Sequence, residues 1–519
     1  MTAHCEAHLP PGWAWTTLGE VCEIGAGGPA PQDEDYFAAD GMPFVRVQDL
    51  GRLEAKDVYA FSTRDSLAQS AASDLTLFPK GTVLFTKSGM STLLNQRAIL
   101  GRDMCVVSHI GTCIPYGDLL SEWVYYWLKT VDFKELTHAT TLPSLQLPKV
   151  RAISLPVPPV PEQSRIVAKI EELFSQLDAG VEELKKAKAQ LKRYRQSVLK
   201  AAFEGKLTEE WRKRRATSHE PLETAQELLA RIREERKKAL GAKYKDPPPL
   251  DTSELPELPE GWVWARLDSI AAIKGGITKD AKRQVPGGHM VPYLRVANVQ
   301  RGYLDLVEVT EILASGEEMA DLGLRRGDVL FTEGGDRDKL GRGWVWQEEI
   351  PLCIHQNHVF RARLYVADVQ PKYVSWYGNI MGRGYFMGAG KQTTNLASIN
   401  MTKLSGLPVA IPPSAEQAEI VSEIELRLSV TDAEDKAVEA ALRQAARLRQ
   451  SILKRAFEGR LVPQDPTDEP ADRLLERIRE ERLARSDERL AGKRRATSER
   501  RLGGKRPATS EERRKRRGD

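Results

Sequence analysis

Two copies of one order of motifs run through the chain. The segment LPPGWAW at residues 9–15 returns as LPEGWVW at residues 258–264. Later, RQSVLKAAFEGKL at residues 195–207 returns as RQSILKRAFEGRL at residues 449–461. The offsets of about 249 and about 254 residues are nearly equal, which indicates that the whole arrangement is duplicated. Such a duplication predicts an internal pseudo-two-fold, and a molecule of that kind suits a target that is read in two halves.

The size and composition are those of a globular protein with several domains. A chain of 519 residues should hold roughly three to four domains, and 41% apolar with 29% charged residues is a globular composition. No apolar run approaches the roughly 20 residues that span a bilayer, and the first residues lack the pattern of a secretory signal. Five cysteines without CxxC spacing indicate reduced thiols. We therefore expect a cytoplasmic protein.

The formal net charge of +4 is concentrated at the end of the chain. Residues 483–519 contain about 14 basic and 6 acidic residues, so this tail alone carries roughly +8. Its composition favours disorder, and non-specific, salt-dependent contact with DNA is the functional alternative. The remainder of the chain is slightly acidic, so any basic groove for nucleic acid must be local.

Each copy begins with about 150 residues that mix strand-like runs with glycine and proline. Alternating apolar runs at residues 43–47 and 81–86 recur at nearly the same offset in the second copy. Because they are bounded by proline and glycine, they predict strands and turns of a compact mixed α/β domain. A proline-rich junction, PPVPEQ at residues 158–163 and PPSAEQ at residues 412–417, then leads into a helix.

A long amphipathic helix follows each junction. From residue 162 to residue 205, apolar residues recur at two heptad positions, and this 3.5-residue period predicts a coiled coil. At about 1.5 Å per residue, that helix extends roughly 65 Å. The second copy keeps the seam less regularly, so we expect a stutter or looser packing near Thr431. The residues assigned to the coiled coil and to subunit contacts are Ile166, Ile170, Leu173, Leu177, Leu184, Leu191, Val198, Phe203, Ile420, Ile424, Val438, Leu448, Ile452 and Phe457.

Chain topology decides how the two helices pair. A straight helix carries the chain from the first domain to the place where the second domain begins. The second helix must lie along the first for both apolar seams to be buried, and an antiparallel direction satisfies the seams and the pseudo-two-fold together. The sequence therefore predicts an α+β fold class, with two globular mixed α/β domains separated by an antiparallel coiled coil. Gly205 and Gly459 are predicted C-caps of the two helices.

This order of motifs resembles the specificity subunit of type I restriction-modification enzymes. The resemblance covers residues 9–482 and rests on the two junctions, at residues 158–163 and 412–417, and on the two helix ends. Those ends read FEGKL at residues 203–207 and FEGRL at residues 457–461. Each motif is weak alone, whereas their order in duplicate is specific.

The resemblance implies a DNA-binding role in phage defence. Each globular domain would be a target recognition domain that reads one half of a bipartite DNA sequence, and the coiled coil would set the spacer. Double-stranded DNA, two modification (methyltransferase) subunits and restriction (motor and nuclease) subunits would be the partners. Adenine methylation and restriction would take place in those subunits, which would hold S-adenosylmethionine, ATP and Mg. This chain would be non-catalytic, with no cofactor or metal of its own.

The two copies differ most inside their globular domains. Identical domains related by a two-fold would read a palindrome, so domains this different predict an asymmetric target. The expected parts are a first target recognition domain at residues 1–157, a helical region at 158–245, a linker at 246–257, a second target recognition domain at 258–410, a helical region at 411–482 and the basic tail at 483–519.

Polar residues in glycine-bearing loops are the candidates for DNA contact. Base edges favour Arg, Lys, Asn and Gln, while phosphates accept Lys, Arg, Ser and Thr. In the first domain the candidates are Lys87, Ser88, Asn95, Gln96, Arg97, Thr140 and Thr141. In the second domain they are Lys274, Thr278, Lys279, Arg337, Lys339, Arg342, Lys391, Gln392, Thr393, Thr394 and Asn395. For each residue, a surface role without DNA contact is the alternative.

Three other motifs are weak signs of catalysis or metal binding. DPPP at residues 246–249 lacks the aromatic residue of an amino-methyltransferase signature, so a linker is favoured. GAGKQTT at residues 388–394 misplaces one glycine of a phosphate loop and lacks its Ser or Thr, so a glycine-rich loop is favoured. His355 and His358 would need further ligands to bind a metal, and Cys353 is the nearby candidate.

Two other classes of function compete with DNA recognition. A self-contained methyltransferase or nuclease would need cofactor motifs that the sequence lacks. A structural coiled-coil scaffold whose domains bind protein or glycan would leave the order of motifs unexplained. The repeated tryptophans beside each domain start could stack on bases, but their repetition favours a structural anchor.

Overall fold

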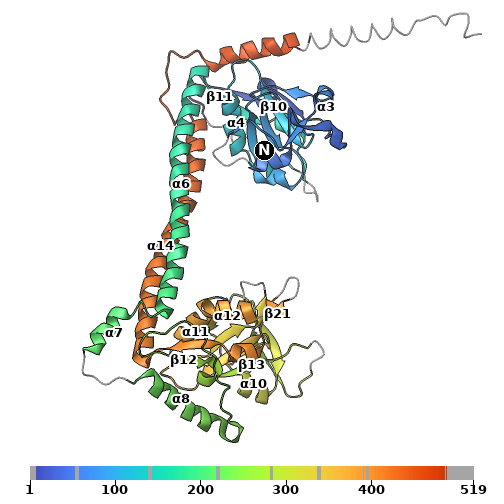
Figure 1. Cartoon of the computed structure of the whole chain (residues 1–519). Coiled ribbons are helices and arrows are strands. Elements are labelled where there is room, and N and C mark those ends of the chain that lie inside the picture. Colours follow the sequence, from blue (N-terminus) through green and yellow to red (C-terminus); the bar gives the residue numbers. More distant parts are fainter. Residues whose placement is uncertain are drawn as a thin grey trace, which may run out of the picture. The chain divides into compact units, whose positions relative to one another are not determined.

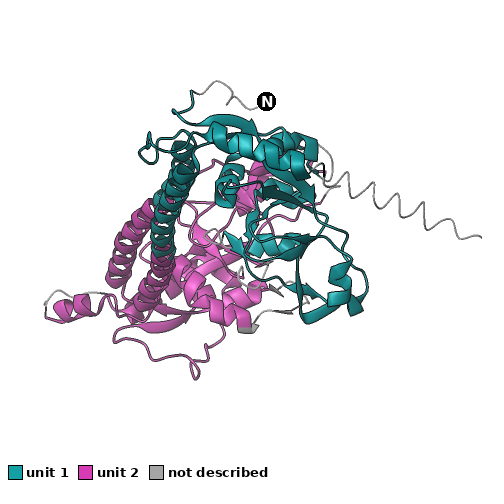
Figure 2. Cartoon of the chain, turned by 90° about the horizontal axis from the view of Figure 1, so that it is seen from above, with its two compact units in different colours: residues 1–185, 440–519 teal, residues 186–439 magenta. Residues whose placement is uncertain are grey.

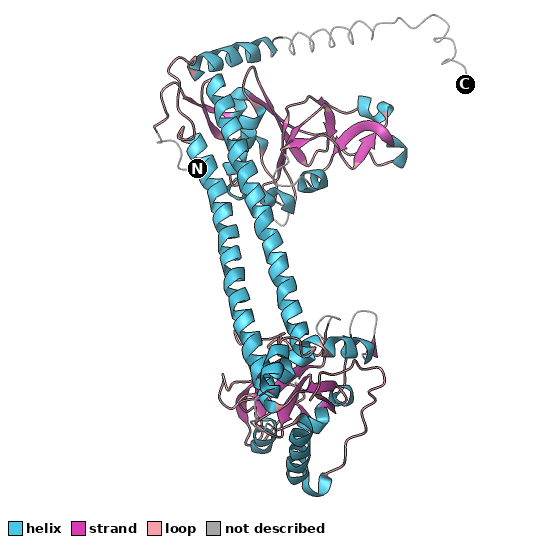
Figure 3. Cartoon of the chain, turned by 60° about the vertical axis from the view of Figure 1, so that its left-hand side comes forward, coloured by secondary structure: helices cyan, strands magenta, loops and turns pink. Residues whose placement is uncertain are grey.

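The computed structural model divides the chain into two compact units, whose elements are labelled in Figure 1. The first unit comprises residues 1–185 and 440–519, and the second comprises residues 186–439 (Figure 2). Strands occur in the globular part of each unit (Figure 3). Within the described residues, none of the helices is long and apolar enough to pass through a bilayer. The structure describes residues 8–52, 58–137, 143–217, 223–280, 284–335, 340–389, 391–392, 397–485 and 487.

The first globular domain is closed by its own first and last strands. β1 (Ala14–Thr17) and β11 (Ser154–Val157) pair antiparallel, so the chain leaves for the long helix beside the point where it entered. A five-stranded sheet has the order β2 (Cys22–Ala26), β10 (Ile110–Pro115), β7 (Val83–Thr86), β8 (Arg97–Leu100) and β4 (Tyr59–Ala60). A four-stranded sheet has the order β5 (Asp65–Leu67), β3 (Phe37–Val45), β9 (Met104–Val106) and β6 (Leu77–Phe78).

The central strands of the first domain are buried on both faces. Along β7, Val83 and Phe85 join the core cluster beneath the helices, whereas Leu84 joins a second cluster on the other face. This burial explains why the run at residues 81–86 is apolar at consecutive positions. The helices of this domain are α1 (Leu18–Val21), α2 (Val47–Arg52), α3 (Gln69–Ser73), α4 (Ser121–Thr130) and α5 (Leu147–Arg151).

The second globular domain repeats this plan. β12 (Val263–Arg266) and β23 (Pro408–Ile411) close it as β1 and β11 close the first. Its sheets have the orders β13 (Ala271–Gly275), β20 (Val359–Leu364), β16 (Val329–Thr332) and β18 (Gly343–Val345); β15 (Thr310–Ala314), β14 (His289–Leu294) and β19 (Ile354–His355); and β17 (Gly334–Gly335), β22 (Ala397–Ser398) and β21 (Lys391–Gln392). Its helices are α9 (Leu267–Ile270), α10 (Gly316–Leu322), α11 (Pro371–Ile380), α12 (Gly382–Ala389) and α13 (Met401–Ser405).

Two helices of 44 residues each, α6 (Val160–Phe203) and α14 (Ser414–Phe457), follow the two domains. In the second unit, Lys188 pairs with Glu439, and Arg195 pairs with Asp432. Seven residues forward on α6 thus correspond to seven residues backward on α14, so the helices run antiparallel. In the first unit the guanidinium of Arg449 on α14 pairs with Asp178 and lies over the ring of Phe174 on α6. The predicted mixed α/β domains and antiparallel helix pairing are confirmed.

The predicted seam is best covered near the globular domains. Ile166, Ile170, Val198, Phe203, Ile420, Ile424 and Phe457 are buried. Leu173, Leu177, Leu184, Leu191, Val438 and Ile452 are half-buried, as expected where two helices cover each other without a third. Thr431, at the predicted irregularity, is buried and donates its hydroxyl to the carbonyl of Arg427 at 2.8 Å.

The assignment of Leu448 to the seam is wrong. Its side chain is 45% exposed, whereas Ala445 and Leu453 on either side are buried. The next residue, Arg449, takes the inward position because its guanidinium pairs with Asp178. The seam therefore steps by four residues from Ala445 to Arg449, and Leu448 is turned towards solvent.

Both long helices end in the predicted glycine caps. Gly205 and Gly459 have φ values of +69° and +66°, a left-handed conformation that glycine adopts without strain. The next amide in each case, from Lys206 or Arg460, donates to a carbonyl five residues earlier. After α6 come α7 (Glu209–Ala216) and α8 (Ala225–Leu240), and after α14 residues 471–485 are helical. Most of the expected basic tail lies outside the described residues.

Candidate nucleic-acid interface

A buried tryptophan–glutamate bond ties each domain to its long helix. The Trp13 indole Nε1 donates to Glu162 Oε2 at 3.0 Å, and the Trp262 indole Nε1 donates to Glu416 Oε2 at 2.9 Å. Both tryptophans are buried, which confirms the predicted anchor for these two. The carboxylates also lie in the first turn of their helices, where the helix dipole favours negative charge.

The glutamine of each junction holds a second helix of the same domain. Gln163 Oε1 accepts from the backbone amide of Leu120, which precedes α4, at 3.1 Å. Gln417 Oε1 accepts from the amide of Gln370, which precedes α11, at 3.0 Å. The Glu-Gln pair of each junction motif therefore fixes how the domain sits on the start of its long helix.

On this frame, the strand VLFT of each copy leads into a loop with the same backbone bonds. In the first domain, the Lys87 amide donates to the His109 carbonyl at 2.9 Å, and its carbonyl accepts from Leu145 at 2.8 Å. In the second, the Glu333 amide donates to the His358 carbonyl at 2.9 Å, and its carbonyl accepts from Ile399 at 2.8 Å. The two backbones are thus equivalent at this point.

The side chains at these equivalent positions differ. We call Lys87, Ser88 and His109 the first loop site, and Glu333, Gly334 and His358 the second loop site. In the first, the Ser88 hydroxyl lies 2.7 Å from His109 Nδ1. In the second, Glu333 itself pairs with His358 Nδ1. Both imidazoles are exposed, so each loop site presents polar groups to solvent.

Sequence reasoning missed two members of these loop sites, His109 and Glu333, and it weighed His358 for metal binding alone. Aligning the two copies on their shared VLFT strand would have placed Glu333 opposite Lys87. The partnership with His109 depends on strand pairing between β7 and β10, which that alignment does not reveal.

The other candidates of the first domain fall into two groups. The Gly89 amide donates to the Pro143 carbonyl at 2.9 Å, so the loop after β7 meets the segment that follows Thr140 and Thr141. Those two threonines lie outside the described residues. Asn95 and Gln96 are half-buried, but Arg97 is 3% exposed within β8. The expectation that Arg97 lies in a surface loop is wrong, because its guanidinium stacks at 3.8 Å on the ring of Phe133.

In the second domain, Thr278 and Lys279 are exposed. Lys274 is ion-paired with Asp321, and Arg342 is turned inward to Gln300. Neither of these two cations projects freely from a loop. Their DNA contacts stay predictions.

A small sheet brings two predicted stretches of the second domain together. β17 pairs with β22, which pairs with β21, so residues 334–335 and 391–392 share one sheet. Lys391 and Gln392 form β21, although their side chains are outside the description. Arg337, Lys339, Thr393, Thr394 and Asn395 also lie outside the described residues.

The weaker motifs do not form catalytic or metal sites in the described part of the chain. Residues 388–389 end helix α12 and lead to a strand, whereas a phosphate loop leads into a helix N-terminus. Among the described residues, no group of three His, Cys, Asp or Glu side chains could hold a metal ion. His355 is fully buried, and burial lowers the pKa of its imidazole to about 4. It is therefore a neutral core residue.

Comparisons with known proteins agree with this architecture. A family model described as "Type I restriction modification DNA specificity domain" matches residues 10–193. The chain is 25% identical over 497 residues to the specificity subunit of the type I restriction enzyme EcoKI from Escherichia coli, covering 92% of this chain and 97% of that protein. It is 24% identical over 494 residues to the StySPI specificity subunit of Salmonella potsdam, covering 91% and 96%.

Solved structures share the fold. The HsdS subunit of Thermoanaerobacter tengcongensis superposes with a TM-score of 0.51 at 18% identity, over 88% of this chain and 100% of that one. A chain from a structural study of complex assembly in the type I R-M system gives a TM-score of 0.61 at 18% identity, over 87% and 99%. Residues 10–193 thus match the DNA specificity domain family, and the chain as a whole is similar to type I restriction enzyme specificity subunits over nearly its full length. The alternative of a scaffold for other ligands finds no support in these matches.

Proposed function

We propose that this chain reads an asymmetric, bipartite DNA target, with one half-site assigned to each globular domain. The observation that carries the proposal is the pair of loop sites, which share backbone hydrogen bonds and differ in their side chains. An equivalent backbone gives the two domains a similar approach to duplex DNA. Different side chains on that backbone select different bases, so the half-sites are unlike.

The chemistry of the loop sites supports base reading in the major groove. A lysine such as Lys87 can donate to the O6 and N7 acceptors of guanine, or to a phosphate. A carboxylate such as Glu333 is repelled by phosphates but can accept from the N4 amino group of cytosine. The two domains therefore prefer bases with opposite hydrogen-bonding character at equivalent positions.

The antiparallel helices act as the ruler between the half-sites. A helix of 44 residues is about 66 Å long at about 1.5 Å per residue. Inserting seven residues, two helical turns, into both α6 and α14 lengthens each helix by about 10 Å and the spacer by about three base pairs.

The catalytic steps belong to partner subunits in the cytoplasm. Two modification subunits transfer a methyl group from S-adenosylmethionine to adenine, and restriction subunits use ATP and Mg to move along DNA and cut it. This chain directs both activities to the target and holds no cofactor.

Sequencing of methylated adenines tests the proposal. The full chain is expressed with its modification subunits, and the expected motif has two unlike halves separated by a fixed spacer. A palindromic motif would contradict the asymmetric reading. Replacing residues 258–406 with the corresponding domain of another family member should change one half-site, and a change in both would refute the assignment of one domain to each half.

Single substitutions at the loop sites give a finer test. Lys87→Ala should weaken methylation by about tenfold and relax only the first half-site, since one good base contact contributes roughly 1–3 kcal/mol of discrimination. Glu333→Ala is the matched variant and should relax only the second half-site. Unchanged specificity in both variants would remove the loop sites from base reading.

A further inference from the structure

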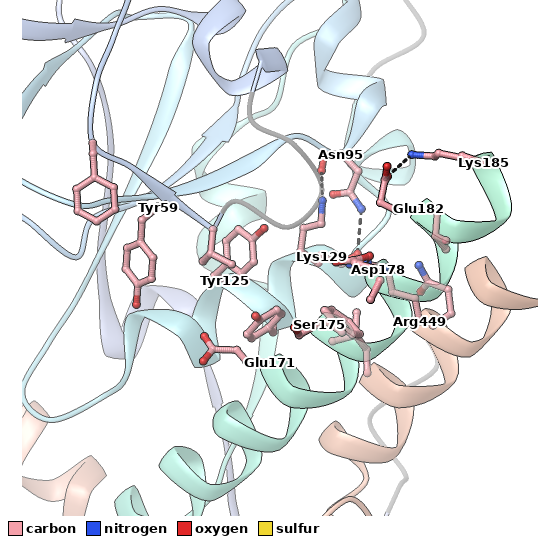
Figure 4. Close-up of a pocket in the computed structure, with 18 residues that line it drawn as sticks. Tyr59, Asn95, Tyr125, Lys129, Glu171, Ser175, Asp178, Glu182, Lys185 and Arg449 are labelled. Carbon is pink, nitrogen blue, oxygen red and sulfur yellow. Dashed lines mark hydrogen bonds and ion pairs between the residues drawn. The ribbon is translucent and has the colours of Figure 1, made fainter. Parts of the chain in front are cut away.

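The first unit contains a cavity of about 1210 Å³ against the first domain. Its walls come from α4, α6, α14 and the strand β4, and Figure 4 shows the side chains that line it. One end carries Tyr59 and Tyr126. The other end is cationic, with Lys129 and with Arg449, whose guanidinium lies over the ring of Phe174.

Two cations, Lys129 in the cavity wall and the buried Arg97 behind it, have no carboxylate partner among the described residues. Lys129 Nζ donates to the Asn95 carbonyl at 3.0 Å, and Arg97 Nη1 donates to the Gln96 carbonyl at 2.7 Å. The remaining buried donors of Arg97, Nε and Nη2, have no hydrogen-bond partner within the described structure. Asn95 itself adopts the left-handed conformation, with φ +51°.

The cations are close enough to repel one another. Burial, followed by the charges of Arg97 and Arg449, lowers the pKa of Lys129 to about 8. Burial lowers the pKa of Arg97 to about 9. A buried guanidinium beside a half-buried ammonium is unfavourable unless an anion compensates the two charges, because the lowered dielectric strengthens their repulsion.

The carboxylates around the cavity are already engaged or lie at its other end. Asp178 pairs with Arg449, and Glu182 pairs with Lys185 (Figure 4). Glu171 lies near Glu122, whose carboxylate accepts from the Tyr59 hydroxyl. Burial, followed by this like charge, raises the pKa of Glu171. The cationic end is therefore not neutralised by the acidic groups that share the cavity.

At the positions equivalent to Arg97 and Lys129, the second domain has two uncharged residues, Gly343 and Asn379. Arg97 lies opposite Phe85 between β8 and β7, and Gly343 lies opposite Phe331 between β18 and β16. Lys129 is the ninth residue of α4, as Asn379 is of α11. In the second domain the Gly343 amide donates to Asn379 Oδ1 at 2.9 Å, and Asn379 Nδ2 donates to the Gly343 carbonyl at 2.8 Å. A closed neutral pair there corresponds to two uncompensated cations in the first domain.

We propose that the cationic end of this cavity binds a phosphate group. Lys129 contacts the phosphate from the cavity wall, while Arg97 behind it adds positive charge that no carboxylate of the described residues compensates. The cavity volume exceeds what a phosphate fills, so the group can be carried by a larger molecule. The phosphate comes either from a nucleic-acid backbone or from a free anion in solution. This site is independent of base reading, since it uses none of the loop-site residues.

Titration of the full chain with inorganic phosphate tests the site, with sodium chloride added to hold the ionic strength constant. We expect the thermal midpoint to rise saturably, by about 3 °C at a concentration tenfold above the dissociation constant. Lys129→Asn, which installs the residue of the second domain, should abolish the saturable rise. Lys129→Arg should retain it.

Lys134→Asn is the matched control, because it removes the same charge from an exposed position near α4. It should respond like the unaltered chain, which separates a bound phosphate from a general salt effect. An equal rise in Lys129→Asn, or no saturable rise in the unaltered chain, overturns the proposal. Neither result bears on the half-site assignment, which methylation sequencing tests separately.

A competition experiment identifies the source of the phosphate. If target duplex DNA displaces bound inorganic phosphate, the site receives the DNA backbone. If DNA and phosphate bind together with unchanged affinities, the site serves a free anion. Both outcomes support the phosphate site, because each requires saturable binding that depends on Lys129.

Discussion

The two tryptophan–glutamate junctions share one geometry but differ in how the glutamate is satisfied. In the second unit, Glu416 Oε1 accepts from the hydroxyl of Thr208 at 2.7 Å and pairs with Arg212. In the first unit, Glu162 Oε1 is buried and has no hydrogen-bond partner among the described residues. The difference arises just after the helix caps. Thr208 is the third residue after Gly205 and supplies a hydroxyl donor, whereas the third residue after Gly459 is Val462, which has no donor in its side chain.

The same contrast occurs inside the domains. The second domain closes Gly343 on Asn379 with two hydrogen bonds, while the first leaves Arg97 and Lys129 without counter-charge. In both comparisons the polar groups of the second unit have hydrogen-bond or ion-pair partners, whereas the equivalent groups of the first unit lack some of theirs among the described residues. Duplication of the backbone therefore did not preserve the polar partners at these two places.

The largest expected effect comes from breaking the complete junction. Glu416→Gln removes the ion pair with Arg212, and its NH2 group replaces one of the two oxygens that accept from Trp262 and from Thr208, so one of these donors loses its acceptor. We expect a loss of about 3 kcal/mol in the free energy of unfolding, because the glutamate side chain is only 1% exposed. Urea denaturation followed by circular dichroism measures this loss.

Arg212→Met is the control for that prediction. It leaves the carboxylate buried with Trp262 and Thr208 as donors, so it should also destabilise the second unit. If Glu416→Gln were as stable as the unaltered chain, the second junction would not depend on its ion pair and the contrast between the units would fail.

The helix caps should behave alike in the two units. A Cβ atom on Gly205 would lie 2.4 Å from Pro259 Cγ, and one on Gly459 would lie 2.3 Å from Pro10 Cγ. Alanine at either position combines this clash with a left-handed backbone, so each should lower stability by about 2 kcal/mol. Thermal denaturation of the two variants measures the effect, and a loss at one cap only would mean that the two frames are not equivalent.

The frame could be predicted from the sequence because its signals are local and repeated. The seam of α6, the glycine caps and the VLFT strands each follow from the spacing of neighbouring residues. The partners of Glu162 and Glu416 could not be predicted, since each bond to tryptophan spans about 150 residues and depends on how the domain closes.

The candidate site was harder to predict than the frame. In the sequence, Arg97 next to Gln96 is typical of a polar surface loop. The Arg97 side chain is buried because it stacks on Phe133, which comes from a later segment of the chain. The error at Leu448 has a similar origin, because a heptad pattern cannot anticipate that Arg449 turns inward to meet Asp178. Loop-site partners such as His109 depend on strand pairing in the same way.

Removing the uncompensated cation from the first domain should stabilise it. Lys129→Asn is expected to raise the free energy of unfolding at pH 7 by no more than about 1 kcal/mol, because solvent screens a partly exposed cation. The unaltered Lys129 has a pKa lowered to about 8, so the unfolded chain binds more protons between that value and the ordinary 10.5. Stability of the unaltered chain should therefore rise with pH across this interval.

The measurement is urea denaturation in a phosphate-free buffer, repeated at several pH values from 7 to about 10, near the ordinary lysine pKa. In the Lys129→Asn variant, the free energy of unfolding should lack the pH-dependent rise that Lys129 contributes. The Lys134→Asn variant should keep that rise. Identical pH profiles for the unaltered chain and Lys129→Asn would show that the cationic cluster carries no strain.

The smallest effect is expected at the incomplete junction. Burial raises the pKa of Glu162, which outweighs the opposing effect of the bond from Trp13. The folded chain therefore keeps a proton on this carboxyl that the unfolded chain has lost, and this contribution to stability declines as pH rises from the ordinary value through the raised one. Glu162→Gln retains an acceptor for Trp13 without the buried charge, so at pH 7 its stability should lie within about 1 kcal/mol of the unaltered chain.

Denaturation between pH 4 and 7 should show a flatter dependence of stability on pH for the Glu162→Gln variant. If Glu162→Gln were as destabilising as Glu416→Gln, the first junction would be as complete as the second, through a partner beyond the described residues.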